Sequence, residues 1–274
     1  MNDKAVIDSI ANETLKAIDS HREMTPFSPR VPGFGLPMAY AAAARLRVLR
    51  EARGETLGGR KVGFTNRAKW ADAGVDRPMW GDVYKEKIHH IGTNGGTFKA
   101  SDLLAPLLEP EMMLKLSAAP SPDMDEAALI GCLESYSIGY EIIQSMFGTA
   151  KFQQADTVGA GSMFAALLVG PARKVDTSKA AALMNDLATF KIALRRDGET
   201  QDQGTGATVL GSPLSSLKFL VGALDQHPDH PALKAGDIVS TGIITSRAMP
   251  IAPGATWSTK VEGLDLQDIS VTFA

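Results

Sequence analysis

The sequence predicts an α+β fold, in which a β-rich core follows a small N-terminal α/β layer. Two observations support this. Helical spacing of apolar residues dominates the first fifty positions, whereas short strand-like runs follow one another from Leu108 to the C-terminus. The chain has 274 residues, of which 44% are hydrophobic, so it can bury a large core. Helices followed by a run of strands are typical of α+β proteins.

The N-terminal part is expected to contain two helices. Apolar residues recur at helical spacing from Val6 to Ile18, which predicts an amphipathic helix over the first two dozen residues. Prolines and glycines crowd between Pro26 and Pro37 and interrupt any regular element. A second helix is expected from about Met38 to Arg53, followed by a strand from Lys61 to Thr65. We expect this N-terminal layer to occupy residues 1–70 and the catalytic core residues 71–274.

Seven strands are expected in the core, each as a short apolar run. They cover Met112 to Leu116, Ile138 to Ile143, Met163 to Val169, Ala188 to Arg195, Ile238 to Ile244, Thr256 to Val261 and Ile269 to Phe273. Asp197-Gly198 indicates a hairpin turn, and Ser212-Pro213 indicates a helix start. His227 and His230 flank Pro228, which favours a loop over a metal pair.

Composition excludes several classes of function. The 28 basic and 31 acidic residues give a net charge of −3, so a nucleic-acid partner is not expected. Cys132 is the single cysteine, which excludes an internal disulfide and a thiol-ligated zinc site. The start of the chain lacks the basic and apolar segments of a signal peptide, and the longest apolar runs are too short to span a bilayer. We expect a soluble cytoplasmic protein with no membrane association.

Three acidic residues form a candidate metal site. Glu109 and Glu111 are two positions apart in a predicted strand, so both carboxylates point to one face, about 7 Å apart. An ordinary half-buried strand edge would show the same alternation. Glu141 lies in the middle of an apolar strand, where a charge is costly without a partner. Three oxygen ligands without cysteine would select a hard ion such as Mg²⁺ or Mn²⁺.

Lys61 is a candidate catalytic residue because Gly59 and Gly63 flank it at the start of an apolar strand. Little neighbouring side-chain cover would let its ammonium group reach a substrate carboxylate or enolate. Desolvation would then lower its pKa toward acid–base use. The alternative is an exposed lysine at the end of a strand, and the residues alone leave both interpretations open.

Several segments, taken in order, resemble motifs of one enzyme family. The resemblance runs from about residue 59 to the C-terminus. It is carried by Gly59 to Thr65 (G-x-K-[IV]-G-[LF]-T), Gly74 to Gly81 (G-V-x-x-P-x-x-G), Glu109 to Glu111 (E-x-E), Tyr140 to Ile142, Asp156 to Val158 (D-T-V), Gly204 to Leu214 (G-x-G…L-G-H-P-L) and Leu233 to Gly242 (L-x-x-G-D-I-[IV]-L-[ST]-G). The chain thus resembles the 2-keto-4-pentenoate hydratase and 4-oxalocrotonate decarboxylase family, and its collinear order is more specific than any single motif.

The resemblance implies a fumarylacetoacetase C-terminal-like core and a role in the catabolism of aromatic compounds. It implies Glu109, Glu111 and Glu141 as ligands of Mg²⁺ or Mn²⁺ and Lys61 as the catalytic residue facing the substrate. It also implies a homo-oligomer and, for decarboxylase members, a partner hydratase. Four further residues in or beside these motifs are expected to bind a small 2-oxo or enolic carboxylate substrate. These are Thr65, Asp156, Ser162 and Thr241.

Two departures from the family pattern affect the expected chemistry. Ala160 and Gly161 replace an acid and an amide, and Ser212 replaces a histidine. We therefore expect a roomier and less polar pocket. The principal hypothesis is a metal-dependent lyase that hydrates a 2-hydroxydienoate to a 4-hydroxy-2-oxo acid. The alternatives are decarboxylation of a 4-oxalocrotonate-type 2-oxo diacid, C–C bond hydrolysis or tautomerisation at the same site, and a catalytically weak subunit that binds a ligand or partner.

Overall fold

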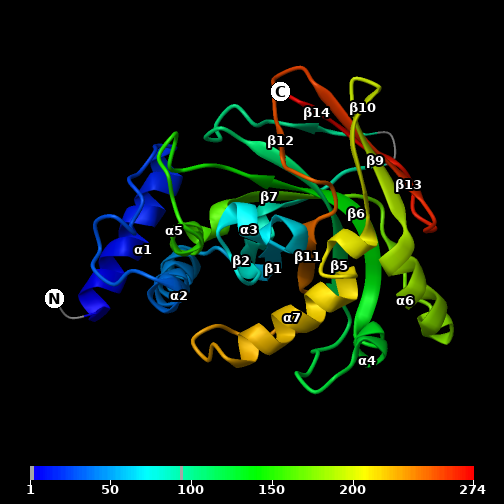
Figure 1. The fold of residues 1–274 in the computed structure, drawn as a ribbon, viewed down its shortest axis with the longest axis horizontal. Coiled ribbons are helices and arrows are strands. Elements are labelled where there is room, and N and C mark those ends of the chain that lie inside the picture. The colour runs from blue at the N-terminus through cyan, green and yellow to red at the C-terminus, as the bar shows by residue number, and fades with distance from the viewer. Residues whose placement is uncertain (1–2, 93–94) are drawn as a thin grey trace.

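The structure is a computed structural model that describes residues 3–92 and 95–274. Two β-sheets form its body, with helices at their ends and along one side (Figure 1). The helices are α1 (Asp3–Ser20), α2 (Leu36–Ala52), α3 (Trp70–Ala73), α4 (Glu126–Ile130), α5 (Gln154–Gly159), α6 (Ala180–Thr189) and α7 (Pro213–Asp225). Short 3₁₀ turns are η1 (Arg67–Lys69), η2 (Lys85–Lys87), η3 (Gly161–Met163), η4 (Thr177–Lys179) and η5 (Gly206–Thr208).

The larger sheet brings together strands from the two ends of the chain. Its order is β2-β1-β11-β5-β6-β7-β3, with β12 paired to β5 and β8 to β6, and the smaller sheet runs β10-β9-β13-β14-β4. The strands are β1 (Leu57–Gly63), β2 (Met79–Tyr84), β3 (Ile88–His90), β4 (Thr97–Phe98), β5 (Leu107–Leu116), β6 (Leu133–Ile143), β7 (Phe164–Val169), β8 (Arg173–Lys174), β9 (Lys191–Arg196), β10 (Glu199–Thr205), β11 (Ile238–Ile243), β12 (Met249–Pro250), β13 (Thr256–Glu262) and β14 (Ile269–Phe273).

The main core lies between the two sheets and beneath α6 and α7. Alternate residues of β5, such as Leu114 and Leu116, are fully buried there together with Trp257 of β13. A buried hydrogen bond of 3.0 Å from the Thr259 hydroxyl to the Tyr140 hydroxyl links the smaller sheet to the larger one. The predicted α+β fold is confirmed.

Most predicted elements are present, with one clear error in the second half. The two N-terminal helices, the hairpin at Asp197-Gly198 and the helix that begins at Pro213 are confirmed. The strand predicted from Ala188 was wrong at its start, since α6 continues to Thr189 and β9 begins at Lys191. Leu183 and Leu187 explain the helix, because residues four apart bury one helical face. Gly204-Thr205-Gly206, the start of the G-x-G…L-G-H-P-L-like segment, ends β10 and begins η5.

The N-terminal helices form a layer at one edge of the larger sheet (Figure 1). Helix α1 packs on α2, and α2 packs on α5. Strand β1 pairs in parallel with β11 and antiparallel with β2, and so belongs to the sheet of the core. The division of the chain at residue 70 stays a prediction, and this pairing favours a boundary between α2 and β1.

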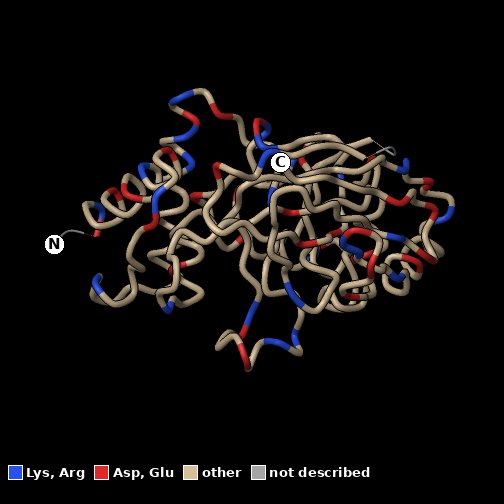
Figure 2. Tube along the Cα trace, turned by 90° about the horizontal axis from the view of Figure 1, so that it is seen from above, with Lys and Arg blue, Asp and Glu red and all other residues tan. Residues whose placement is uncertain are grey.

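Charge and hydropathy are distributed as in a folded domain. Lys and Arg alternate with Asp and Glu along the whole described trace (Figure 2). One helical stretch, Gly206–Asp225, is long and apolar enough to cross a membrane by length and composition alone. Its apolar residues Leu217, Leu220 and Leu224 are instead buried in the core, so α7 serves here as a core helix.

Candidate metal centre and cavity

Three glutamates meet on the two central strands of the larger sheet. Glu109 and Glu111 share one face of β5, and Glu141 lies directly opposite Glu109 on β6. One carboxylate oxygen from each residue lies within 4.8 Å of the others. Glu111 and Glu141 are buried, and Glu109 is partly exposed. Strand alternation and cross-strand register together produce this cluster.

The carboxylates are held with oxygen atoms free to bind a cation. Oε2 of Glu111 accepts hydrogen bonds from the Ser240 hydroxyl at 2.6 Å and the Gly242 amide at 2.8 Å. This fixes the side chain and leaves Oε1 available. Neither oxygen of Glu141 has a hydrogen-bond partner within residues 3–92 and 95–274, although the residue is fully buried. A buried carboxylate without such a hydrogen bond, beside two other carboxylates, fits a hard divalent ion, since such ions take oxygen ligands.

Burial and mutual repulsion make full ionisation of the cluster unfavourable without a cation. Burial raises the pKa of Glu109 to about 7, and the charge of Glu141 adds to this rise while Lys61 opposes it. Burial likewise raises the pKa of Glu111 well above its usual range, reinforced by Glu141 and Glu109. Burial also raises the pKa of Glu141, against the effect of Lys61. Positive charge is therefore stabilising at this point of the molecule.

Lys61 of β1 supplies one positive charge. Its Nζ lies 3.2 Å from Oε1 of Glu141, and the side chain is only 3% exposed, so it is not a surface lysine. Burial by itself would lower the pKa of Lys61, but the fields of Glu141, Glu109 and Glu111 outweigh it and raise the pKa. The sequence-based expectation of a lowered pKa was therefore wrong, because it omitted the three carboxylates.

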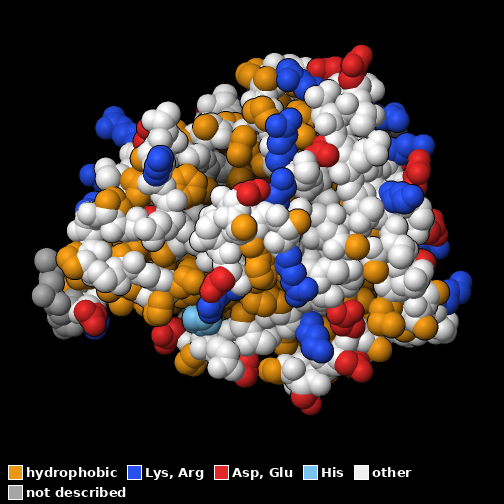
Figure 3. Space-filling model, in the orientation of Figure 1, with side chains coloured by type: hydrophobic (Ala, Val, Ile, Leu, Met, Phe, Trp, Pro, Cys, Tyr) orange, Lys and Arg blue, Asp and Glu red, His pale blue; other side chains and the backbone are white. Residues whose placement is uncertain are grey.

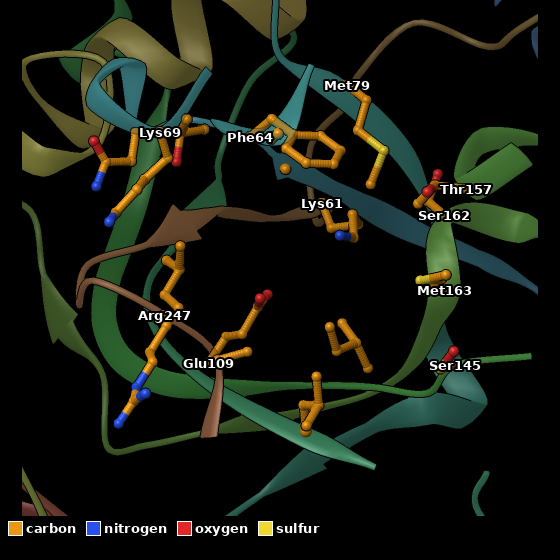
Figure 4. A pocket seen from close by; sticks show the side chains of 18 of the residues that line it. Lys61, Phe64, Lys69, Met79, Glu109, Ser145, Thr157, Ser162, Met163 and Arg247 are labelled. Carbon is orange, nitrogen blue, oxygen red and sulfur yellow. The ribbon is translucent and has the colours of Figure 1, made fainter. Parts of the chain in front are cut away.

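A cavity of about 460 Å³ opens beside the cluster (Figure 4). Lys61 and Glu109 lie near its middle, Ser162 and Met163 at one side, and Arg247 at another. Apolar side chains make up much of the remaining wall. They include Phe64, Trp70, Met79, Leu107, Ile143, Phe152 and Ile243. Such a mostly apolar cavity with a few convergent polar groups is typical of a small-molecule site.

Sequence similarity to known proteins places the chain in a family. The chain is 30% identical over 224 residues to 2-keto-4-pentenoate hydratase 2 of Dechloromonas aromatica (strain RCB), covering 81% of this chain and 80% of that protein. It belongs to the 2-keto-4-pentenoate hydratase family. 4-Oxalocrotonate decarboxylase of Pseudomonas putida is 28% identical over 263 residues, covering 95% and 93% of the two chains. No protein-family model matches the chain.

A solved member of this hydratase and decarboxylase family shares the fold over nearly the whole chain. The 4-oxalocrotonate decarboxylase from Pseudomonas putida G7, complexed with magnesium and adipate, superposes with a TM-score of 0.88 at 26% identity. The match covers 99% of this chain and 98% of that one. The protein is therefore an enzyme of a family that contains hydratases and decarboxylases, and the predicted resemblance is confirmed.

Two of the four predicted substrate-binding residues, Thr65 and Ser162, line the cavity of the protein. Thr65 is buried, and its hydroxyl has no hydrogen-bond partner in the described part of the chain. It packs against Gly242, where φ is +114° and a Cβ would lie 2.1 Å from the Thr65 hydroxyl, so this position requires glycine. Ser162 has φ of 59° and donates a hydrogen bond to the Trp80 carbonyl at 3.0 Å.

The other two predicted substrate-binding residues do not line this cavity. Both oxygens of Asp156 are occupied, as Oδ1 accepts from the Phe27 and Ser28 amides and Oδ2 from the Ser28 hydroxyl and the Gln153 amide. The Thr241 hydroxyl donates to the Met112 carbonyl at 3.0 Å. Their contact with substrate stays a prediction, and these polar atoms already have partners within the fold.

The departures from the family pattern have structural explanations. Ser212 is the N-cap of α7, and its hydroxyl accepts from the amides of Leu214 and Ser215. Ala160 is buried against Phe147 and Met163. A Cβ at Gly161 would point toward Leu46 of α2. Neither Ala160 nor Gly161 lines the cavity, whereas Met163 does, so these two positions could affect the pocket only through their neighbours.

Several cavity residues were not predicted from the sequence. Thr157 lines the cavity and follows Asp156 in the same motif, so the motif that suggested Asp156 could also have suggested Thr157. Lys69 lies on η1 and Arg247 in the loop between β11 and β12. These two lie outside every recognised motif, and only the folded chain brings them to the cavity.

Proposed function

We propose that the protein is a divalent-metal-dependent hydro-lyase that adds water to a 2-hydroxydienoate and yields a 4-hydroxy-2-oxo acid. The observation that carries this proposal is the cluster of Glu109, Glu111, Glu141 and Lys61, two members of which, Glu109 and Lys61, line one apolar cavity. The three glutamates would hold Mg²⁺ or Mn²⁺, which when bound polarises the substrate's carboxylate and 2-oxygen as a Lewis acid.

The chain's own residues would then act on the substrate. The Lys61 ammonium group would stabilise negative charge that develops on the substrate oxygens, and its Nζ can hold or donate a proton at that point. The free Thr65 hydroxyl would donate a hydrogen bond to the bound substrate. The apolar walls would exclude bulk water and so strengthen these interactions. In the overall reaction the 2-hydroxyl group loses its proton and becomes the 2-oxo group, while C5 gains a proton. Water then adds across the C3=C4 double bond and places its hydroxyl group on C4.

Decarboxylation is a second candidate because of one specific observation. The structure with a TM-score of 0.88 is a 4-oxalocrotonate decarboxylase, and the match covers both chains almost completely. In that reaction the same polarised dienolate would retain the electron pair of the broken C–C bond as CO₂ leaves. A catalytically weak binding subunit is disfavoured, since the three glutamates and Lys61 all remain in place.

The assignment is tested by product analysis. Purified protein with Mg²⁺ or Mn²⁺ is incubated with a panel of 2-hydroxydienoates, and the products are identified by mass. A gain of water supports the hydratase, and a loss of CO₂ supports the decarboxylase. An unchanged panel would refute both. We further propose that the protein is a cytoplasmic homo-oligomer. If it proves to be a decarboxylase, we propose that a hydratase is its partner enzyme.

A further inference from the structure

The charge of the cavity suggests which kind of 2-oxo acid it binds. With a divalent ion in place, the three glutamate carboxylates, the Lys61 ammonium group and the ion sum to zero charge. Two further cations, Lys69 and Arg247, line the same cavity. Among the described residues that line it, Glu109 is the only acid. Two positive charges thus remain to be balanced by what the cavity binds.

The backbone that carries Arg247 is fixed while its side chain is free. The preceding residue, Ser246, donates from its amide and its hydroxyl to Oδ2 of Asp202, at 2.9 and 2.6 Å. The Thr245 hydroxyl donates to the Arg247 carbonyl at 3.3 Å. The Arg247 guanidinium makes no hydrogen bond or ion pair with any residue of the described ranges 3–92 and 95–274. The loop therefore presents a cation that has no partner among the described residues.

Lys69 is presented in the same way by a different segment. The Asn66 side chain caps η1 by accepting from the Ala68 amide at 3.1 Å. The adjoining Trp70 indole donates to the Phe64 carbonyl at 2.7 Å. The Lys69 ammonium group makes no hydrogen bond or ion pair in the described part of the chain. Two independently anchored segments thus each direct an unpaired cation to this cavity.

Both cations lie at the side of the cavity away from Ser162 and Met163, with Lys69 at one end of that side and Arg247 at the other (Figure 4). On the face that carries α3 and β12, Lys and Arg side chains form a row across the middle of the molecule, next to hydrophobic side chains (Figure 3). Much of the remaining cavity wall is apolar. A ligand that fits has a carboxylate at each end and a hydrocarbon middle.

We propose that Lys69 and Arg247 form a second carboxylate subsite, so that the substrate is a 2-oxo or 2-hydroxydienoic diacid in preference to a monoacid. This inference rests on the proposed function, because the first carboxylate is assigned to the glutamate and Lys61 end. Arginine and lysine bind carboxylates through charge-assisted hydrogen bonds, which are stronger than neutral ones. The subsite selects substrate by the chemistry at its far end and is compatible with either hydration or decarboxylation.

The test uses two ligands that differ in one group. 2-Oxoadipate and 2-oxohexanoate have the same chain length and the same 2-oxo acid end, and both are saturated, so neither offers a double bond for hydration. Calorimetry with Mg²⁺ present should show the diacid binding about tenfold more tightly or better. This preference should shrink as NaCl is raised, because the rim is exposed to solvent.

Variants locate the preference. Lys69→Met and Arg247→Met should each reduce it several-fold, and the double variant should bind both ligands equally. Arg67→Met is the matched control, since Arg67 is on the same turn as Lys69 but stacks over Trp70 outside the cavity wall. It should keep the full preference.

The outcomes separate this inference from the proposed function. Equal binding of both ligands by the unaltered protein, or a preference that survives in the double variant, would overturn the second subsite alone. If neither 2-oxo acid bound in a Mg²⁺-dependent manner, the metal-dependent function would fall and the subsite with it. A preference that is abolished in the double variant and retained in Arg67→Met would support the proposal.

Discussion

Asp156 and Glu141 are both fully buried acids, yet the protein treats them in opposite ways. Asp156 accepts four hydrogen bonds and thereby ties the loop after α1 to helix α5. Glu141 accepts no hydrogen bond from any described residue and lies beside Lys61 and two other glutamates. A saturated carboxylate contributes to stability, whereas an unsaturated one remains available for a ligand.

The same contrast is repeated within β1. Arg60 is fully buried, and its guanidinium contacts Asp82 at 3.1 Å and donates to the Pro231 carbonyl at 2.8 Å. The next residue, Lys61, points to the other face of the sheet and toward the cavity. One strand thus carries a structural cation and a functional one side by side. Substitution of a structural group should lower stability, whereas substitution of a functional group should lower ligand binding or rate.

The largest effect is expected from removing one metal ligand. Glu111→Gln should abolish most Mn²⁺ binding and activity, while the amide oxygen can still accept from Ser240 and Gly242 and so preserve the fold. Calorimetry with Mn²⁺ and thermal melting measure the two properties. Glu134→Gln, on the same strand pair but paired with surface Lys115, is the matched control. Unchanged Mn²⁺ affinity in Glu111→Gln would remove the metal-site assignment.

Lys61 should matter for rate more than for folding. Lys61→Met should lower kcat by about a hundredfold or more, equivalent to roughly 3 kcal/mol of transition-state stabilisation. Steady-state kinetics and melting with saturating Mg²⁺ separate the two effects. Lys115→Met, a lysine of the same sheet far from the glutamates in β5, should retain the normal rate. A fully active Lys61→Met protein would show that the ion pair with Glu141 is only structural.

Asp156 should show the opposite behaviour to Glu111. Asp156→Asn would turn an amide group toward donors that now meet a carboxylate, at a cost of about 2–4 kcal/mol in the free energy of unfolding. Urea unfolding measures this loss, and Mn²⁺ affinity in the folded variant should be unaltered. A stable variant with weakened 2-oxo acid binding would instead restore Asp156 as a substrate-binding residue.

The smallest effect concerns a buried base, His230. Its Nε2 lies 3.0 Å from the Tyr40 carbonyl, and its Nδ1 has no hydrogen-bond partner among the residues that the structure describes. Burial lowers the pKa of His230, although Asp82 opposes this. As the pH falls, this histidine therefore takes up a proton in the unfolded chain before it does so in the folded protein. The contribution of His230 to the free energy of unfolding is fully present above about pH 6.5 and is lost as the pH falls below that value.

Replacing the buried histidine should flatten this dependence. His230→Gln should give a melting temperature that changes less between pH 7 and pH 5, because the side chain can still donate to Tyr40 but no longer titrates. His90→Gln, at an exposed site, should melt with the same pH profile as the unaltered protein. Identical profiles for all three proteins would mean that His230 does not contribute to acid sensitivity.

The sequence by itself determined the α+β class, most strands and which three glutamates form the cluster. Residue alternation places Glu109 and Glu111 on one face, and an acid within an apolar strand singles out Glu141. These inferences work because strand periodicity and the cost of burying a charge are local properties. Lys61 was also identified, through its motif, but its pKa shift depends on carboxylates that lie on other strands.

Only the tertiary structure decided which acids are open and which are saturated. Asp156 and Glu111 each bond to a residue 129 positions away, Phe27 in one case and Ser240 in the other. Lys69 and Arg247 likewise meet at one cavity from segments that are distant in sequence. A side chain's hydrogen-bond partners, unlike its chemistry, are set by long-range packing. The physical reason is that the availability of a charged group depends on what surrounds it, which no local pattern records.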